Sequence, residues 1–154
     1  MSPEWWALLH GFLATLFLMS FSGSYVELIS PNLSSLKRLK LGVSLMALSS
    51  WAIFLTGTYA YIFYRAPVPG SARSRILAGT TPWVHTLLME LKEFSGAYVP
   101  AIAVLAVAIV FGWNYRLLSE PRLRQVLGVV LWAGMLWTLL AYGLGAYITK
   151  TAAI

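Results

Sequence analysis

Two histidines, His10 and His85, are the candidate metal ligands of this sequence, which contains no cysteine. Imidazole is a common ligand of haem iron, and histidines on different helices can supply both axial ligands of a b-type haem. The absence of cysteine excludes thiolate metal sites, iron–sulfur clusters and covalently attached haem. We therefore predict His10 and His85 as candidate haem-iron ligands. The simpler interpretation is a snorkelling or hydrogen-bonded His10 and a solvated His85.

Three charged residues, Glu90, Lys92 and Glu93, follow His85 within two helical turns. Groups of this kind can hydrogen-bond a quinone headgroup and exchange its protons. More often they form a solvated helix face whose ion pairs contribute little. Trp51 and Trp137 are candidates of another type, because two large rings could line a pocket for a flat apolar cofactor or quinone. Packing between helices is the simpler role for both.

The composition places all these residues in or beside a membrane. The chain has 154 residues, of which 59% are hydrophobic and only 10% are charged, so it lies outside the range of soluble domains. Apolar stretches at about 5–29, 41–64, 94–113 and 126–149 are each long enough to cross a bilayer, which takes about 20 residues. Because lipid offers no hydrogen bonds to the backbone, these stretches must be helical. We predict a single all-α membrane domain over 1–154, built as a four-helix bundle.

The basic residues predict the orientation of the bundle. The connections 30–40 and 114–125 hold six of the eleven Lys and Arg residues. The positive-inside rule therefore makes these connections cytoplasmic and puts both termini on the non-cytoplasmic side. We expect a bacterial inner (cytoplasmic) membrane, with the lipid bilayer as the partner of the basic residues. Nucleic acid is not expected, since these connections lack the interleaved aromatic residues of nucleic-acid readers.

The sequence also matches itself at an offset of 86 residues. Residues 42–63 and 128–149 share nine identities in 22 positions, and the same offset places Trp51 on Trp137 and Gly57 on Gly143. We interpret this as a duplicated helical hairpin. Between the second and third spans, residues 65–81 have loop composition, and Thr81-Pro82 resembles a helix start. We predict an outer amphipathic helix at about 82–94, or else a third span that continues unbroken through Phe94.

The function expected from these features is that of a small integral membrane subunit of a larger respiratory or photosynthetic electron-transfer complex. Such a subunit could contribute to a haem b or quinone site at the outer side and would contact other membrane subunits. This expectation rests on architecture alone. The alternatives are a cofactor-free structural or assembly subunit and, less favoured, a small transporter, since the spans carry no charge at mid-depth. No nucleotide-binding or hydrolase motif is present, so we expect no catalysis by this chain alone.

Overall fold

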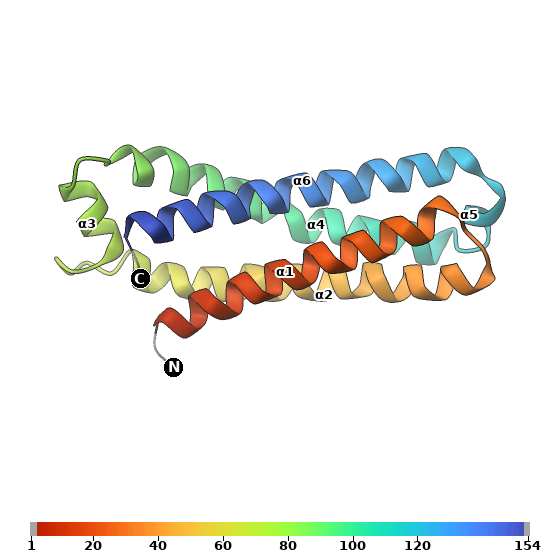
Figure 1. The fold of residues 1–154 in the computed structure, drawn as a ribbon, viewed down its shortest axis with the longest axis horizontal. Coiled ribbons are helices and arrows are strands. Elements are labelled where there is room, and N and C mark those ends of the chain that lie inside the picture. Colours follow the sequence, from red (N-terminus) through yellow and green to blue (C-terminus); the bar gives the residue numbers. More distant parts are fainter. Residues whose placement is uncertain (1–2, 153–154) are drawn as a thin grey trace.

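The computed structural model describes residues 3–152, and the chain in this range is helical with short connections (Figure 1). The elements in chain order are α1 (Pro3–Ile29), α2 (Leu33–Tyr64), α3 (Ala72–Ala78), the π-helical η1 (Val84–Met89), α4 (Glu90–Gly112), α5 (Arg116–Ser119) and α6 (Pro121–Thr151). Four helices are long and apolar enough to cross a membrane, and they cover Glu4–Ile29, Leu33–Tyr64, Val84–Gly112 and Pro121–Thr151. The prediction of an all-α chain with four such helices is confirmed.

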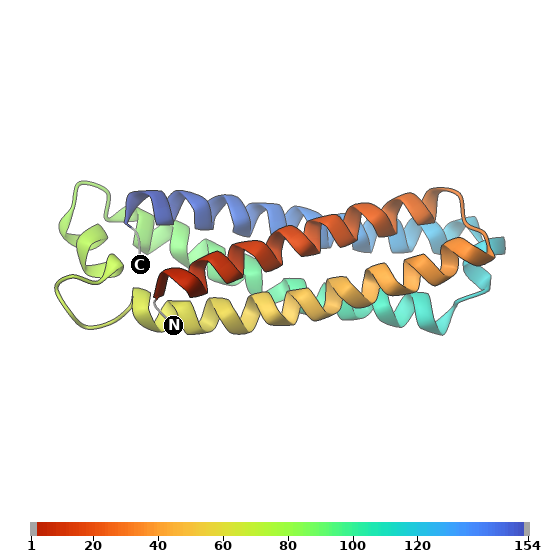
Figure 2. The same cartoon turned by 60° about the horizontal axis from the view of Figure 1, so that its bottom comes forward.

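The four long helices form an elongated bundle (Figures 1 and 2). α1 packs antiparallel to α2, α2 also contacts α4, α4 packs against α6, and α6 contacts α1. The connection between α1 and α2 lies at the same end as α5, while α3 and both ends of the described chain lie at the other (Figure 1). Two adjacent hairpins are what a duplicated unit would form, but the duplication itself stays a prediction.

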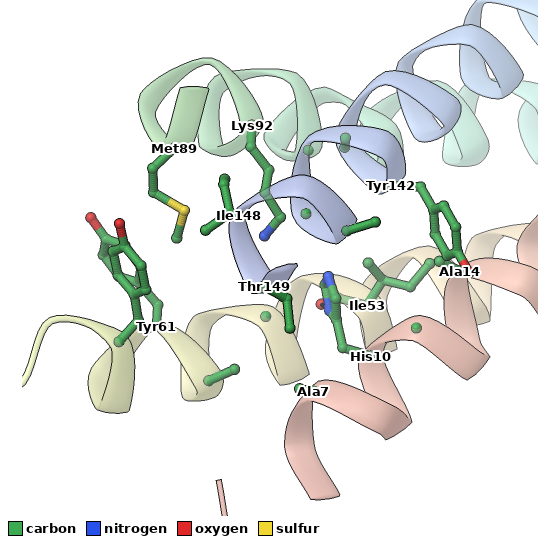
Figure 3. A pocket seen from close by; sticks show the side chains of 18 of the residues that line it. Ala7, His10, Ala14, Ile53, Tyr61, Met89, Lys92, Tyr142, Ile148 and Thr149 are labelled. Carbon is green, nitrogen blue, oxygen red and sulfur yellow. Dashed lines mark hydrogen bonds between the residues drawn. The ribbon is translucent and has the colours of Figure 1, made fainter. Parts of the chain in front are cut away.

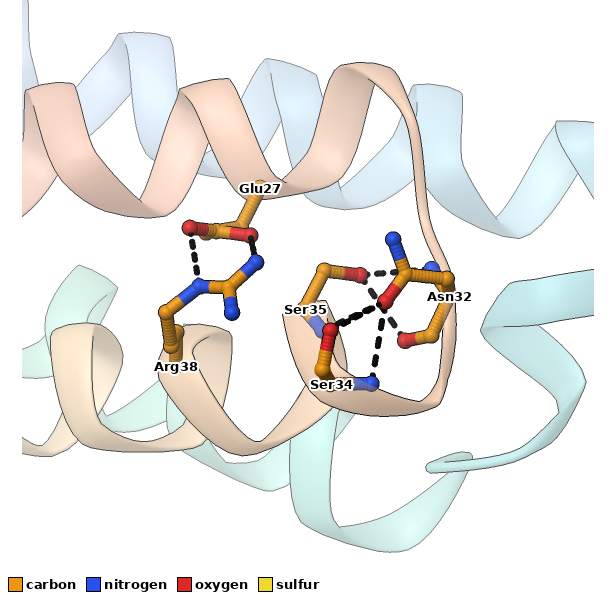
Figure 4. A network of polar contacts seen from close by, with 5 residues as sticks. All are labelled: Glu27, Asn32, Ser34, Ser35 and Arg38. Carbon is orange, nitrogen blue, oxygen red and sulfur yellow. Dashed lines mark hydrogen bonds and ion pairs between the residues drawn. The ribbon is translucent and has the colours of Figure 1, made fainter.

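α2 begins at Leu33, earlier than the predicted start near residue 41, because a polar cap starts it before the apolar run. The Asn32 side chain accepts hydrogen bonds from the backbone N–H groups of Ser34 and Ser35, both at 2.9 Å. The Ser35 hydroxyl in turn accepts from the Asn32 N–H at 2.6 Å, which completes a capping box (Figure 4). One turn later, Arg38 donates to both carboxylate oxygens of Glu27 and joins α2 to α1 (Figure 4).

The separate amphipathic helix predicted at about 82–94 is not confirmed. η1 continues directly into α4, so the third long apolar helix runs from Val84 to Gly112, which is the extent that the alternative of an unbroken helix through Phe94 requires. The buried side of this segment is neither purely apolar nor purely polar. His85 is buried, whereas Leu87 is 59% exposed and Phe94 58% exposed. Val84 and Met89 are buried as well, and Glu90 and Glu93 are exposed.

Candidate functional site

A cavity of about 540 Å³ lies between the four long helices, toward the end that carries α3 (Figure 3). Its lining includes Val99, which belongs to the main buried core, and Tyr64 and Ile148, which belong to a smaller buried group. α1, α2, α4 and α6 all contribute to its lining, which is largely Ala, Gly and aliphatic residues. Its volume is in the range of small-molecule sites, about 300–1,000 Å³.

His10 reaches into this cavity from α1 (Figure 3). Its Nδ1 lies 2.9 Å from the carbonyl oxygen of Ile53 and 3.3 Å from Oγ1 of Thr56, both on α2. Because a carbonyl oxygen can only accept, Nδ1 carries the proton in this contact. The neutral ring then has Nε2 as an acceptor or ligand atom. This position agrees with the interpretation of a hydrogen-bonded His10.

Gly57 makes the position of the His10 ring possible. A Cβ atom at residue 57 would lie 2.8 Å from Cε1 of His10, closer than two carbon atoms pack. The ring therefore rests directly on the backbone of α2. Gly143, which the 86-residue offset aligns with Gly57, has nothing within 4 Å of the corresponding point. The two glycines occupy matching sequence positions, but only Gly57 is required by a neighbouring side chain.

Lys92 enters the cavity from α4, and Figure 3 shows its ammonium group pointing toward the same space as His10. Its stem passes over Gly145 of α6, where a Cβ atom would lie 2.9 Å from Cε of Lys92. The ion pairs of residues 3–152 join Arg38 to Glu27 and Arg116 to Glu120, so Lys92 is in neither. Glu4 also lines the cavity, but no carboxylate of residues 3–152 forms an ion pair with Lys92. An ammonium group without an ion pair in largely apolar surroundings favours a ligand with carbonyl or anionic oxygens.

Thr138 adds a polar group whose hydrogen-bonding capacity is unused. Its Oγ1 is buried, has no hydrogen-bond partner in the described part of the chain, and belongs to a residue that lines the cavity. Buried polar atoms in proteins are normally paired, so an orphaned hydroxyl indicates a place for a water molecule or a polar ligand atom.

His85 is held in a separate hydrogen-bond network with Tyr64 and Arg73. It is only 5% exposed, so the expectation of a solvated His85 is wrong. Nε of Arg73 donates to Nε2 of His85 at 3.1 Å, and Nδ1 lies 3.0 Å from the hydroxyl of Tyr64. Since Nε2 accepts, Nδ1 carries the proton and donates to the tyrosine oxygen. Both ring nitrogens are engaged, and His85 does not line the cavity that His10 enters.

The remaining predicted site residues lie outside the cavity. Glu90 and Glu93 are exposed, and of the three charged residues only Lys92 lines the cavity. Trp51 is 50% exposed and its ring contacts Phe54, while Trp137 is partly buried against the main core. The structure therefore brings His10 and Lys92 together, and it leaves His85, the two carboxylates and both tryptophans elsewhere. Sequence reasoning gave no site role to Gly57, Gly145 or Thr138, and Gly57 stood out only as a match in the repeat.

We expect Tyr64→Phe to loosen the contact between α2 and His85 of η1, and with it the attachment of α3, which is bonded to the same histidine through Arg73. The variant leaves the buried Nδ1–H of His85 without an acceptor, and an unsatisfied donor of this kind costs about 1–3 kcal/mol. Amide hydrogen exchange across residues 66–83 should become faster, and the thermal unfolding temperature should fall. Tyr59→Phe is the control, because its ring contacts with Trp6 and Phe63 survive the change. Equal effects of both variants would contradict this role of Tyr64.

Comparison with known proteins adds no relative to these observations. No protein-family model, no curated protein and no solved structure matches this chain.

Proposed function

We propose that this chain is a small integral membrane subunit of an electron-transfer complex and that its cavity binds a quinone. The observation that carries the proposal is the convergence of His10 and Lys92 in one largely apolar cavity. A quinone is an apolar ring with two carbonyl oxygens, and its reduced form has two hydroxyl groups. Lys92 can donate to a carbonyl oxygen, and Nε2 of His10 can accept from a quinol hydroxyl. A donor and an acceptor in one site suit both redox forms.

The basic connections support an outer location for this site. The cavity lies toward the end that carries α3, and the connections 30–40 and 114–125 lie at the opposite end (Figure 1). Those connections hold six of the eleven basic residues. By the positive-inside rule we place them in the cytoplasm, with the termini and the cavity at the non-cytoplasmic side of a bacterial inner membrane. Other membrane subunits would supply the electron donor or acceptor.

The quinone content of the purified chain tests the proposal. Protein prepared from membranes in a mild detergent is extracted with organic solvent, and ubiquinone and menaquinone are measured by chromatography. We expect about one quinone per chain. His10→Leu removes one neutral hydrogen bond and should weaken binding by about threefold to tenfold. His10→Gln keeps an acceptor atom and should recover part of the loss. Wild-type protein that carries no quinone and takes none up would support the cofactor-free structural role instead.

A b-type haem is the second candidate, because the anchoring of His10 is typical of ligating histidines. Such histidines donate their other ring N–H to a carbonyl or carboxylate, as Nδ1 of His10 does to Ile53. Ligation through Nε2 of His85 would require its hydrogen bond from Arg73 to break, and the ring does not line the cavity. Absorption spectra of oxidised and dithionite-reduced protein, compared with those of His10→Leu and His85→Ala, test this candidate. A wild-type protein without haem bands would exclude it.

The cavity has a side that quinone could use to arrive from the lipid. α1 and α6 diverge toward the end that carries the termini in both overall views, and the cavity lies between their separated halves (Figures 1 and 2). Gly11 of α1 lines the cavity, and a Cβ atom there would meet nothing within 4 Å. We expect Gly11→Phe to fold normally but to slow the uptake of added quinone in nanodiscs. Gly23→Phe, on the same helix and equally free of neighbours, should not. Equal uptake by both variants would exclude this route.

A further inference from the structure

A second hollow lies on the outside of the bundle, at the end opposite the cavity. It is a groove of about 620 Å³ between the last turns of α1 and the first half of α6. Its lining consists of Tyr25, Leu28, Ile29, Arg124, Gln125, Gly128, Val129, Trp132, Ala133 and Leu136. The polar members Arg124 and Gln125 lie at the start of α6, and the apolar members follow along the helix. This order is the one in which an inserted phospholipid presents its headgroup and its chains.

Arg124 has hydrogen-bonding capacity left for a headgroup. Its Nη1 donates to the carbonyl oxygens of Leu117 at 2.9 Å and Leu118 at 3.2 Å, which holds the side chain in place beside α5. Nε and Nη2 have no acceptor within residues 3–152. Paired guanidinium N–H groups match the oxygens of a phosphate. A positioned, half-buried arginine with part of its fork unused is therefore a suitable anchor for a phosphate group.

The charge around the groove favours an anionic lipid. Residues 25–40 and 114–125 contain six basic residues and two carboxylates, a net charge of +4 at this end. Both carboxylates are engaged, because Glu27 pairs with Arg38 and Glu120 with Arg116. No carboxylate lines the groove, so Arg124 has no counter-ion there. Tyr25 and Trp132 stack edge to face at 5.5 Å in this groove and offer an aromatic wall to acyl chains.

We propose that this groove is a binding site for one anionic phospholipid of the leaflet that faces the basic connections, with its phosphate on Arg124 and an acyl chain along Val129 and Trp132. The proposal is independent of the quinone cavity, because the two sites lie at opposite ends of the bundle and share no lining residue. Because the proposed site holds both a phosphate group and an acyl chain, free phosphate should not substitute for the lipid.

Native mass spectrometry of the full chain in detergent tests the site. Phosphatidylglycerol and phosphatidylcholine with the same acyl chains are titrated separately, and inorganic phosphate is a third ligand. We expect phosphatidylglycerol to bind at least about fivefold more tightly than phosphatidylcholine, as one basic contact allows. Arg124→Gln should remove this preference. Arg122→Gln, an exposed neighbour on the same helix, should keep it. Equal binding of the two lipids by wild type, or equal losses in both variants, would overturn the proposal.

Arg124 also holds α5 in place, so its substitution changes more than the charge of the groove. A second variant tests the groove and leaves Arg124 unchanged. Gly128 lines the groove, and a Cβ atom there would lie 3.9 Å from Leu28, so a larger side chain fills the groove without clashing at its base. Gly128→Phe should weaken phosphatidylglycerol binding, whereas Gly143→Phe, on the same helix but outside the groove, should not. Unchanged binding by Gly128→Phe would overturn the proposal. So would binding of inorganic phosphate alone, or a lipid-free dimer mass, which would assign the groove to a second copy.

Discussion

Gly57→Ala should abolish most quinone binding, although it adds only one methyl group. The new Cβ atom would lie 2.8 Å from Cε1 of His10, so the ring must leave the α2 backbone and give up the contact between its Nδ1 and Ile53. A displaced ring would also enter the space that the ligand needs. We expect quinone content to fall by about tenfold or more, a larger effect than removing the single hydrogen bond of His10.

The aligned glycine provides a matched control for this substitution. Alanine is favoured over glycine inside a helix by about 1 kcal/mol, so Gly143→Ala, whose Cβ would meet nothing within 4 Å, should be stabilising or neutral. At Gly57 the same gain is opposed by overpacking, which typically costs about 1–3 kcal/mol. Thermal unfolding in detergent and quinone extraction measure the two consequences separately. Full quinone content in Gly57→Ala would refute the assignment of His10 to the ligand site.

The predictions that depend only on the composition of a single stretch of sequence were confirmed. The four apolar stretches form four long helices. Helix starts were less accurate. α2 begins at Leu33 because the Asn32 cap is strong enough to include the charged residues 37–40 in the helix, which an apolar window leaves out.

The candidate site required knowledge that the sequence does not contain, namely how each helix is rotated about its axis. Lys92 and Glu93 are adjacent, yet only Lys92 lines the cavity. His85 was predicted as a ligand or a solvated group, and the short helix α3 instead brings Arg73 against it. Gly57 could be found in the sequence as part of the repeat, but its contact with His10 depends on the packing of α1 against α2. The sequence offered hydrogen bonding as one simple role of His10, but nothing in it predicted the partner Ile53.

Lys92→Met is the second substitution with a large expected effect. Methionine keeps most of the length and apolar stem that pass over Gly145, so the packing between α4 and α6 should survive. What is lost is a charged donor in an apolar cavity, and hydrogen bonds to charged groups contribute about 1.5–3 kcal/mol. The dissociation constant for quinone should therefore rise by about 10- to 100-fold. Titration of quinone-depleted protein in nanodiscs measures this change.

Lys150→Met is the control for Lys92→Met, because Lys150 is exposed at the end of α6 and does not line the cavity. It should leave the dissociation constant unchanged. Stability adds a second test, since an ammonium group without an ion pair in largely apolar surroundings is costly in the empty protein. Quinone-free Lys92→Met should thus unfold at a higher temperature than quinone-free wild type while binding quinone more weakly. Such opposite signs are typical of a residue retained for its ligand. A variant that lost both stability and binding would instead show that Lys92 supports the packing of α4 against α6.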